Sequence, residues 1–192
     1  MNQKTVRYGE GRPDKMQLRT FVPDTDFDRI KDWITDGKAH AMWCANRFQY
    51  PLEKENFVKV LSELAQRTGD IPFAAVTDEG DIAGFFCYSV PPDSGEGRLK
   101  FIVVDPACRG RGTAREMLRL ILLYAAQQKN VKTVSLCVFP ENIRAKKCYE
   151  KAGFRETGTD PQAFSYQEEV WDRCHMAVQV KERQADDRQT GG

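Results

Sequence analysis

The chain lacks several features that mark common classes of protein. It has only two histidines, His40 and His175, and its six cysteines form no C-x-x-C pair, so the sequence indicates neither a metal site nor a redox-active dithiol. No apolar run approaches the length of a membrane span, and residues 1–15 have no signal-peptide core. We therefore expect a cytoplasmic protein with reduced cysteines, no metal and no membrane partner.

An excess of charge of one sign is also missing. The 29 basic and 28 acidic residues give a formal net charge of +1. Such a balance creates no long-range field that would draw a nucleic acid to the protein, so we expect no nucleic-acid partner. Any anionic ligand must then be held by local geometry.

The two ends of the chain differ in composition from the rest. Residues 1–15 and 181–192 are polar, which predicts a flexible N-terminal tail and a disordered C-terminal tail. Residues 16–180 are left as a single domain, a length that can bury a substantial core without disulfides or metals.

Strand and helix patterns occur in the first half of the domain. A capping side chain at Asp24 or Thr25 predicts the start of one helix, and Gly69 predicts the end of another. The aromatic-rich residues 39–50 show no clear period. The strands expected here cover 16–21, 72–77 and 82–90, the last two forming a hairpin, and the helices cover 24–35 and 52–67.

In the second half, strands and helices alternate. The expected elements are a strand at 99–104, a helix at 113–129, a strand at 131–139, a helix at 142–152 and strands at 164–170 and 174–180. An antiparallel half followed by a β-loop-α-β-α unit predicts the α/β class, with a mixed, mostly antiparallel central sheet flanked by helices.

A glycine- and arginine-rich turn connects an expected strand to an expected helix. Arg109, Gly110, Arg111 and Gly112 stand there, and the helix opens at Thr113. Glycines allow positive φ and a close approach of backbone, and a helix N-terminus attracts anions, so the turn predicts a phosphate or pyrophosphate site. A plain turn with solvated arginines is the alternative. No Lys-Ser/Thr pair follows the last glycine, which excludes a P-loop.

A second informative stretch is the expected helix at 142–152. Asn142 suits an N-cap, and Gly153 followed by Phe154 suits a left-handed C-cap. Asn142, Ala145 and Tyr149 lie on one helix face, where Tyr149 offers a hydroxyl group. The alternative is a tyrosine that only packs against the core.

Together the two stretches resemble the GNAT superfamily of N-acetyltransferases, most closely the branch that includes ribosomal-protein and amino-sugar acetyltransferases. The phosphate-loop signature Gln/Arg-x-x-Gly-x-Gly/Ala is matched at Arg109, Gly112 and Ala114. The downstream signature Asn-x-x-Ala-x-x-x-Tyr-x-x-x-Gly-Phe is matched at Asn142, Ala145, Tyr149, Gly153 and Phe154. The resemblance implies a GNAT domain over residues 16–180 with two strands splayed apart at the cofactor site.

The resemblance also implies roles for particular residues. Tyr149 would stand beside the thioester sulfur of acetyl-CoA as general acid, with no metal involved. The residues that would bind acetyl-CoA are Ile102, Val103, Val104, Arg109, Gly110, Arg111, Gly112, Thr113, Ala114, Asn142, Ala145 and Tyr149.

The general base has no counterpart at the position that the family often uses. Many relatives carry a glutamate on the strand before the phosphate loop, but residues 99–104 hold no acid. Glu96 is our candidate base, Asp105 and Glu141 are the other acids nearby, and a water chain is the alternative. Cys108 and Cys148 also raise the alternative of an acetyl-cysteine intermediate, although we expect direct transfer.

The expected activity is that of an acyltransferase that moves an acetyl group from acetyl-CoA directly to a primary amine. The acceptor is left open among a small amine, an amino sugar and a protein N-terminus, and so is a homodimer. Residues 33–50, including Asp36 and Trp43, and then residues 164–171 are expected to select the acceptor, unless they only cover the core. The competing hypothesis is a CoA-binding domain without turnover that acts as a sensor or interaction module.

Overall fold

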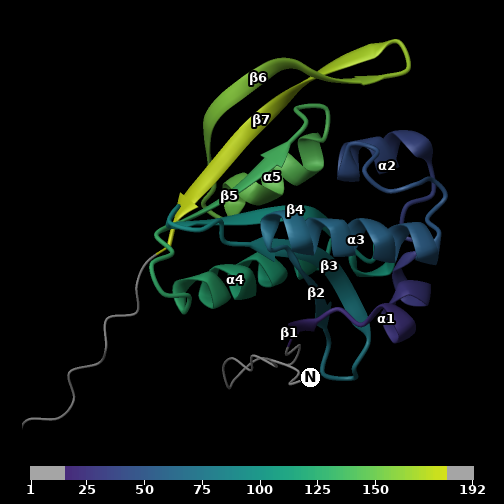
Figure 1. The fold of residues 1–192 in the computed structure, drawn as a ribbon, viewed down its shortest axis with the longest axis horizontal. Coiled ribbons are helices and arrows are strands. Elements are labelled where there is room, and N and C mark those ends of the chain that lie inside the picture. Colours follow the sequence, from purple (N-terminus) through teal and green to yellow (C-terminus); the bar gives the residue numbers. More distant parts are fainter. Residues whose placement is uncertain (1–15, 181–192) are drawn as a thin grey trace, which may run out of the picture.

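The computed structural model describes residues 16–180, which form one seven-stranded sheet with helices on both faces (Figure 1). The strands are β1 (Gln17–Thr20), β2 (Ile71–Val76), β3 (Ile82–Ser89), β4 (Glu96–Val104), β5 (Thr133–Val138), β6 (Arg155–Tyr166) and β7 (Glu169–Gln179). The helices are α1 (Pro23–Ile30), α2 (Gly37–Cys44), α3 (Lys54–Thr68), α4 (Thr113–Ala126) and α5 (Ile143–Lys151), with a short 3-10 turn, η1 (Pro106–Cys108). The tails predicted at 1–15 and 181–192 lie outside the described residues.

The strands lie in the order β1-β2-β3-β4-β5-β7-β6. All neighbours are antiparallel except β4 and β5, which are parallel because α4 carries the chain from the end of one strand back to the start of the other. The predicted class, a mixed and mostly antiparallel α/β sheet flanked by helices, is confirmed.

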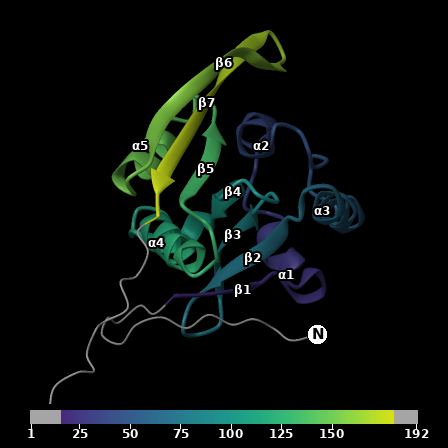
Figure 2. The same ribbon diagram turned by 60° about the vertical axis from the view of Figure 1, so that its left-hand side comes forward.

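Two hydrophobic layers hold the helices to the sheet. Figure 2 shows α4 and α5 on one side of it and α1, α2 and α3 on the other. Met117 and Ile121 of α4 pack against Phe86 of β3 in the first layer, while Phe57 of α3 packs against Phe85 of β3 in the second. Burying each such side chain contributes about 1.5–3 kcal/mol. The two layers therefore hold the sheet in a fixed position, and with it the residues on its strands.

The first helix differs from its prediction at both ends. It begins at Pro23 with Val22 as N-cap and ends at Ile30, whereas we expected a cap at Asp24 or Thr25 and an end near Thr35. The fixed φ of proline suits the first helical position, so the helix starts before the expected caps. Trp33 lies beyond the helix and is nevertheless buried.

The aromatic-rich segment without a clear period contains α2. Asp36 caps this helix by accepting a hydrogen bond of 2.8 Å from the amide of Ala39, and Ala45 ends it with φ of 49°. The helix buries His40, Ala41 and Cys44 and packs beside β4. Cys44 belongs to a hydrophobic cluster with Phe57 of α3, whereas Ala41 belongs to another with Trp171 of β7, so apolar residues are needed on more than one side of the helix.

The C-terminal strands were misplaced in our prediction. A strand expected at 164–170 spans the observed turn between β6 and β7, and most of β6 was missed. The strand β6 is exposed along most of its length, so it lacks the alternation of buried and exposed residues that reveals a strand. Pro161 lies within this strand, Gln162 beside it adopts φ of 52°, and the register with β7 shifts at this point.

Candidate active site

The strands β4 and β5 separate partway along their length. Their pairing runs only from Glu96 and Thr133 to Leu99 and Leu136, although β4 continues to Val104 and β5 to Val138. Beyond the last pair, the backbone groups on this edge of β4 have no strand partner. The predicted splay of two strands is confirmed, and it opens a V-shaped gap in the sheet.

A bulge shapes the β4 wall of this gap. Between the pairs Phe85–Val103 and Cys87–Lys100, β4 contains one residue more than β3, and Phe101 has φ of 54°. Positive φ at a bulky residue costs about 1–2 kcal/mol, and such strain concentrates at functional sites. The bulge changes the direction in which the following amides point, so it sets which backbone N–H groups face the gap.

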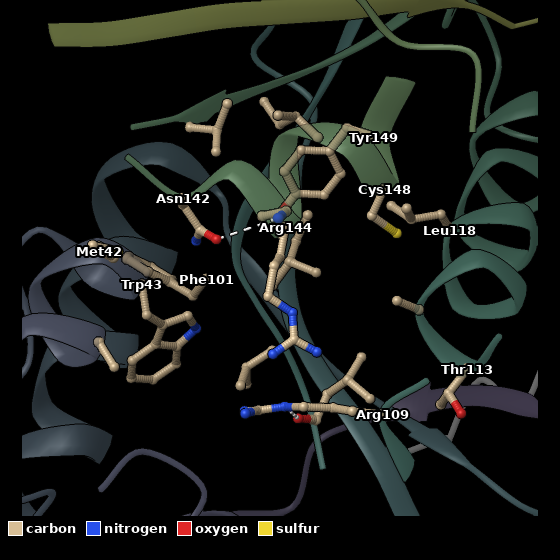
Figure 3. Close-up of a pocket in the computed structure, with 18 of the residues that line it drawn as sticks. Met42, Trp43, Phe101, Arg109, Thr113, Leu118, Asn142, Arg144, Cys148 and Tyr149 are labelled. Carbon is tan, nitrogen blue, oxygen red and sulfur yellow. Dashed lines mark hydrogen bonds between the residues drawn. The ribbon is translucent and has the colours of Figure 1, made fainter. Parts of the chain in front are cut away.

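A cavity of about 790 Å³ fills the gap (Figure 3). Its walls come from β4, the end of β5, the turn before α4, the first turns of α4, the whole length of α5, and the α1–α2 region. The predicted site residues that line it are Ile102, Val103, Val104, Arg109, Gly110, Gly112, Thr113, Ala114, Asn142, Ala145 and Tyr149. Of the predicted residues, Arg111 and Glu96 are not among those that line it.

The turn before α4 has the geometry of an anion site. Gly110 and Gly112 have φ of 78° and 87°, and Gly112 is the N-cap of α4. Because glycine has no side chain to cap the helix, the amides of its first turn are open to a ligand. The hydroxyl of Thr113 donates to the carbonyl of Cys108 at 2.8 Å and holds the turn closed on itself. These open amides fit a pyrophosphate group.

The charges around the cavity are strongly unbalanced. Among the described residues that line the cavity, Asp36 alone is acidic. The basic lining residues are Lys100, Arg109, Arg115, Arg144, Lys147 and Lys151. Figure 3 shows the side chain of Arg144 extending from α5 into the cavity toward Arg109. Although the whole chain has almost no net charge, its basic side chains are concentrated around the cavity. This concentration suits the binding of a multiply phosphorylated ligand.

Tyr149 is held in place by the end of α5. The amide of Phe154 donates to the carbonyl of Tyr149 at 3.0 Å, the amide of Gly153 donates to Glu150 at 3.1 Å, and Gly153 has φ of 100°. This is a Schellman ending, completed by contact between the rings of Tyr149 and Phe154, whose centroids lie 6.1 Å apart. At the other end, Asn142 caps the helix by accepting a bond of 3.3 Å from Ala145.

The side chain of Tyr149 is only 8% exposed. Burial raises the pKa of its hydroxyl above the ordinary value near 10. Figure 3 shows the ring projecting from α5 into the cavity, beside Asn142 and Arg144. A neutral phenol therefore faces the space between the two strands, and it can donate a proton there.

None of the three acids considered for the general base lines the cavity. Glu96 is the first residue of β4 rather than part of a loop, and it accepts a hydrogen bond from Ser135. It lies six residues before Ile102, about 20 Å away along the strand. Asp105 caps η1 by accepting a bond of 2.8 Å from Ala107, and Glu141 is exposed. The structure does not bring Glu96 to the other predicted residues.

Two cysteines line the cavity, Cys108 and Cys148. Burial raises the pKa of both thiols. At Cys108 the charge of Asp105 raises the pKa further and outweighs the opposing effect of Arg111. Both cysteines are thus poor thiolates, which favours direct transfer over an acetyl-cysteine intermediate.

The expected acceptor region divides into two parts. Trp33, Asp36, Met42 and Trp43 line the cavity at the end away from the anion site. Phe48 is buried and stacks on Trp43 with ring centroids 5.3 Å apart, so it supports the wall from behind. The sequence had marked this segment by its aromatic residues but could not tell the lining residues from those that only pack.

Residues 164–171 do not line the cavity. Phe164, Tyr166 and Trp171 form a separate cluster with Phe139 and Ala41. This cluster joins the β6–β7 hairpin to α2. We therefore expect these residues to position the acceptor wall without contacting the acceptor.

Sequence reasoning missed several lining residues. Arg144, Lys147 and Lys151 follow one face of α5, and Arg115 and Leu118 lie on the first turns of α4. The i, i+3, i+7 spacing of Arg144, Lys147 and Lys151 was a usable signal for a basic face of this helix. Within residues 16–180, no helix is long and apolar enough to cross a membrane, and no cluster of three or more ligand-type side chains could hold a metal ion.

Known proteins resemble this chain in both sequence and fold. The sequence profile of the acetyltransferase (GNAT) family matches residues 27–154. A spermine/spermidine N(1)-acetyltransferase of Bacillus subtilis is 31% identical over 131 residues, covering 65% of this chain and 86% of the relative. A mycothiol acetyltransferase of Beutenbergia cavernae is 29% identical over 153 residues, covering 76% of this chain and 50% of the relative.

Solved structures share the fold at lower identity. A spermidine N-acetyltransferase of Vibrio cholerae, in complex with CoA and spermine, matches with a TM-score of 0.71 at 19% identity, covering 87% of this chain and 96% of that one. A putative phosphinothricin N-acetyltransferase matches with a TM-score of 0.69 at 20% identity, covering 88% and 100%. The narrower likeness to ribosomal-protein and amino-sugar acetyltransferases stays a prediction. The chain belongs to the GNAT family of acetyltransferases, and it is an N-acetyltransferase that uses acetyl-CoA as co-substrate.

Proposed function

We propose that the protein transfers the acetyl group of acetyl-CoA directly to a primary amine of a small acceptor, with Tyr149 as general acid. The observation that supports this most is the gap between β4 and β5. It has open helix amides at one end, a neutral phenol at its side and an aromatic wall at the other end. Pyrophosphate would lie on the turn at Gly110–Gly112, and the pantetheine arm would follow Ile102–Val104.

The residues around the gap suit the steps of the transfer. Holding amine and thioester together replaces a bimolecular encounter. An amide of β4 near the bulge at Phe101 can polarise the carbonyl oxygen of the thioester. Tyr149 donates its proton to the departing thiolate, whose ordinary pKa near 8.5 makes it a fair leaving group. An amine with an ordinary pKa near 10 costs about 4 kcal/mol to deprotonate at pH 7, so the acceptor side also needs a proton acceptor.

The names of the relatives favour a small acceptor over a protein N-terminus. Spermine, spermidine and mycothiol acetyltransferases all take their names from small molecules. A polyamine would present several ammonium groups, but Asp36 is the one acid among the described lining residues. We therefore propose an acceptor with one ammonium group near Asp36 and an apolar part against Trp33 and Trp43.

Asp36→Asn tests this placement, because asparagine keeps the cap of α2 and removes only the charge. We expect the KM of the acceptor to rise about two- to fivefold, the size of an exposed charge pair, with little change in kcat or acetyl-CoA affinity. Asp32→Asn is the matched control, since Asp32 is exposed and does not line the cavity. An unchanged KM would place the ammonium group elsewhere.

The proposed function itself is tested by mass-spectrometric detection of acetylated product. The panel contains spermidine, spermine, phenethylamine, glucosamine and a peptide with a free N-terminus. We expect turnover of a small amine and little or none of the peptide. Tight binding of acetyl-CoA without turnover of any amine would instead support the competing hypothesis of a sensor or interaction module. A cytoplasmic location, a homodimer and the absence of nucleic-acid or membrane partners remain predictions.

A further inference from the structure

We propose that Cys137, His175 and Asp160 form a proton relay that accepts the proton of the acceptor amine during acetyl transfer. The proposal rests on the proposed function and supplies the base that Glu96, Asp105 and Glu141, none of which lines the cavity, do not provide. Cys137 would contact the amine, and His175 and Asp160 would act through it.

The three side chains form a continuous chain across three adjacent strands. The Sγ atom of Cys137 lies 3.4 Å from Nδ1 of His175, and Nε2 of His175 lies 2.8 Å from Oδ2 of Asp160. Cys137 and His175 are register partners in β5 and β7, and Asp160 stands on the neighbouring β6. This order of thiol, imidazole and carboxylate allows a proton to move along the chain.

The thiol end of this chain lies where the sheet opens. Leu136 is the last residue of β5 that pairs with β4, and Cys137 follows it directly and lines the cavity. Leu136 and Val138 point into the core, so strand alternation directs Cys137 to the opposite face, away from α4 and α5. The amine can thus approach from the side opposite Tyr149.

The position of Cys137 also suits the length of the gap between β4 and β5. From Val104, beside the anion site, to Lys100, where the gap begins, β4 spans about 13 Å. A substrate whose pyrophosphate lies on the turn before α4 and whose arm follows β4 would bring its acyl end toward this narrow end. Cys137 is the titratable group of β5 that lines the cavity there.

Each proton and each bond is accounted for in the proposed transfer. The ammonium group of the acceptor first passes one proton to Sγ of Cys137 while the thiol proton passes to Nδ1 of His175, from which it leaves to solvent. The neutral nitrogen then bonds to the thioester carbon and loses its second proton by the same path. The resulting imidazolium is stabilised by the carboxylate of Asp160. The bond between carbon and the sulfur of CoA breaks, and that sulfur takes the proton of Tyr149. His175 is 39% exposed, so its proton returns to solvent, from which Tyr149 is reprotonated.

The surroundings of Cys137 favour a relay over a nucleophile. Burial raises the pKa of this thiol, so it rests protonated and donates to His175. Arg173 on β7 and Arg98 on β4 lower the pKa, whereas Asp160 on β6 and Glu96 on β4 raise it, and these opposing charges leave burial dominant. A thiolate that attacked the thioester would have to form first.

Two amines separate a relay from a structural role. The first is the amine of the panel that is acetylated fastest, and the second is hydroxylamine, which is largely uncharged at neutral pH and depends less on a base. For the first amine we expect His175→Gln and Cys137→Ala each to lower kcat/KM about 100-fold, the usual size of a general-base effect. Cys137→Ser, which keeps a proton-bearing group, should lose less. For hydroxylamine the losses should be several times smaller.

Gln179→Ala is the control, because Gln179 lies exposed on the same face of β7 as His175 and four register pairs from Cys137. It should retain the wild-type rate, and all variants should keep the wild-type affinity for acetyl-CoA. Equal losses with both amines, or wild-type rates in the variants, would overturn the relay alone. A mass gain of one acetyl group on Cys137 without amine would show a nucleophile instead. A wild-type protein that turns over no amine overturns the proposed function and the relay with it.

Discussion

Replacing Gly112 by aspartate is expected to abolish acetyl-CoA binding while leaving the protein folded. Gly112 adopts φ of 87° at the start of α4, and a Cβ atom built there meets nothing within 4 Å. The substitution therefore costs about 1–2 kcal/mol of backbone strain without a clash. Its carboxylate would face the same open amides as the pyrophosphate and would repel it. We expect the Kd to rise more than about 100-fold, which corresponds to roughly 2.7 kcal/mol.

Gly80 offers a closely matched control for this variant. It adopts φ of 88°, it also has open space around its Cβ position, and it lies in the hairpin turn between β2 and β3 rather than beside the cavity. Gly80→Asp therefore adds similar strain and the same charge. Calorimetric titration should show wild-type affinity for this control and no measurable binding for Gly112→Asp. Normal binding by a folded Gly112→Asp would show that the pyrophosphate lies elsewhere.

Tyr149→Phe is expected to lower kcat about 100-fold with little change in acetyl-CoA affinity. The variant keeps the buried ring and its contact with Phe154 but removes the proton donor, and a positioned acid typically contributes 100-fold or more. Because burial raises the pKa of Tyr149, the hydroxyl keeps its proton as the pH rises to at least about 10. The wild type should therefore show no loss of rate from this group between pH 7 and about 10.

Tyr124→Phe is the control for this second prediction. Tyr124 is also buried, with its pKa raised by burial, but its ring packs against Phe73 and Tyr88 and does not line the cavity. Steady-state rates should be unchanged in this variant. If Tyr149→Phe also retained the wild-type kcat, the departing thiolate would need no proton from this position.

Features set by local contacts could be predicted from the sequence. The cap at Asn142 and the ending at Gly153 and Phe154 depend on hydrogen bonds within one short helix, so their residue types reveal them. The same holds for Gly69, which ends α3 with φ of 67°. The placement of Tyr149 on its helix followed from these signals.

Features set by contacts distant in sequence could not be predicted. The bulge at Phe101 is defined by how β4 pairs with β3. A phenylalanine in a sequence does not predict positive φ, so the bulge could not be foreseen. The contact of Cys137 with His175 joins residues 38 apart, and strand register alone brings them together. Glu96 was expected in a loop near the site, but the backbone extends β4 to include it at the remote end.

The paired section between β4 and β5, the seam of the sheet, is short, and this limits how firmly the two groups of strands are joined. Within residues 16–180, four residue pairs of β4 and β5 join strands β1–β4 to strands β5, β7 and β6, together with the bonds that the amides of Lys132 and Thr133 donate to the carbonyl of Gly95. A molecule that lies along β4 and against α5 would contact both groups of strands and restrict their motion relative to each other. Occupancy should therefore slow hydrogen exchange on both sides of the seam at once, so that the enzyme is stiffest when it carries its acetyl donor.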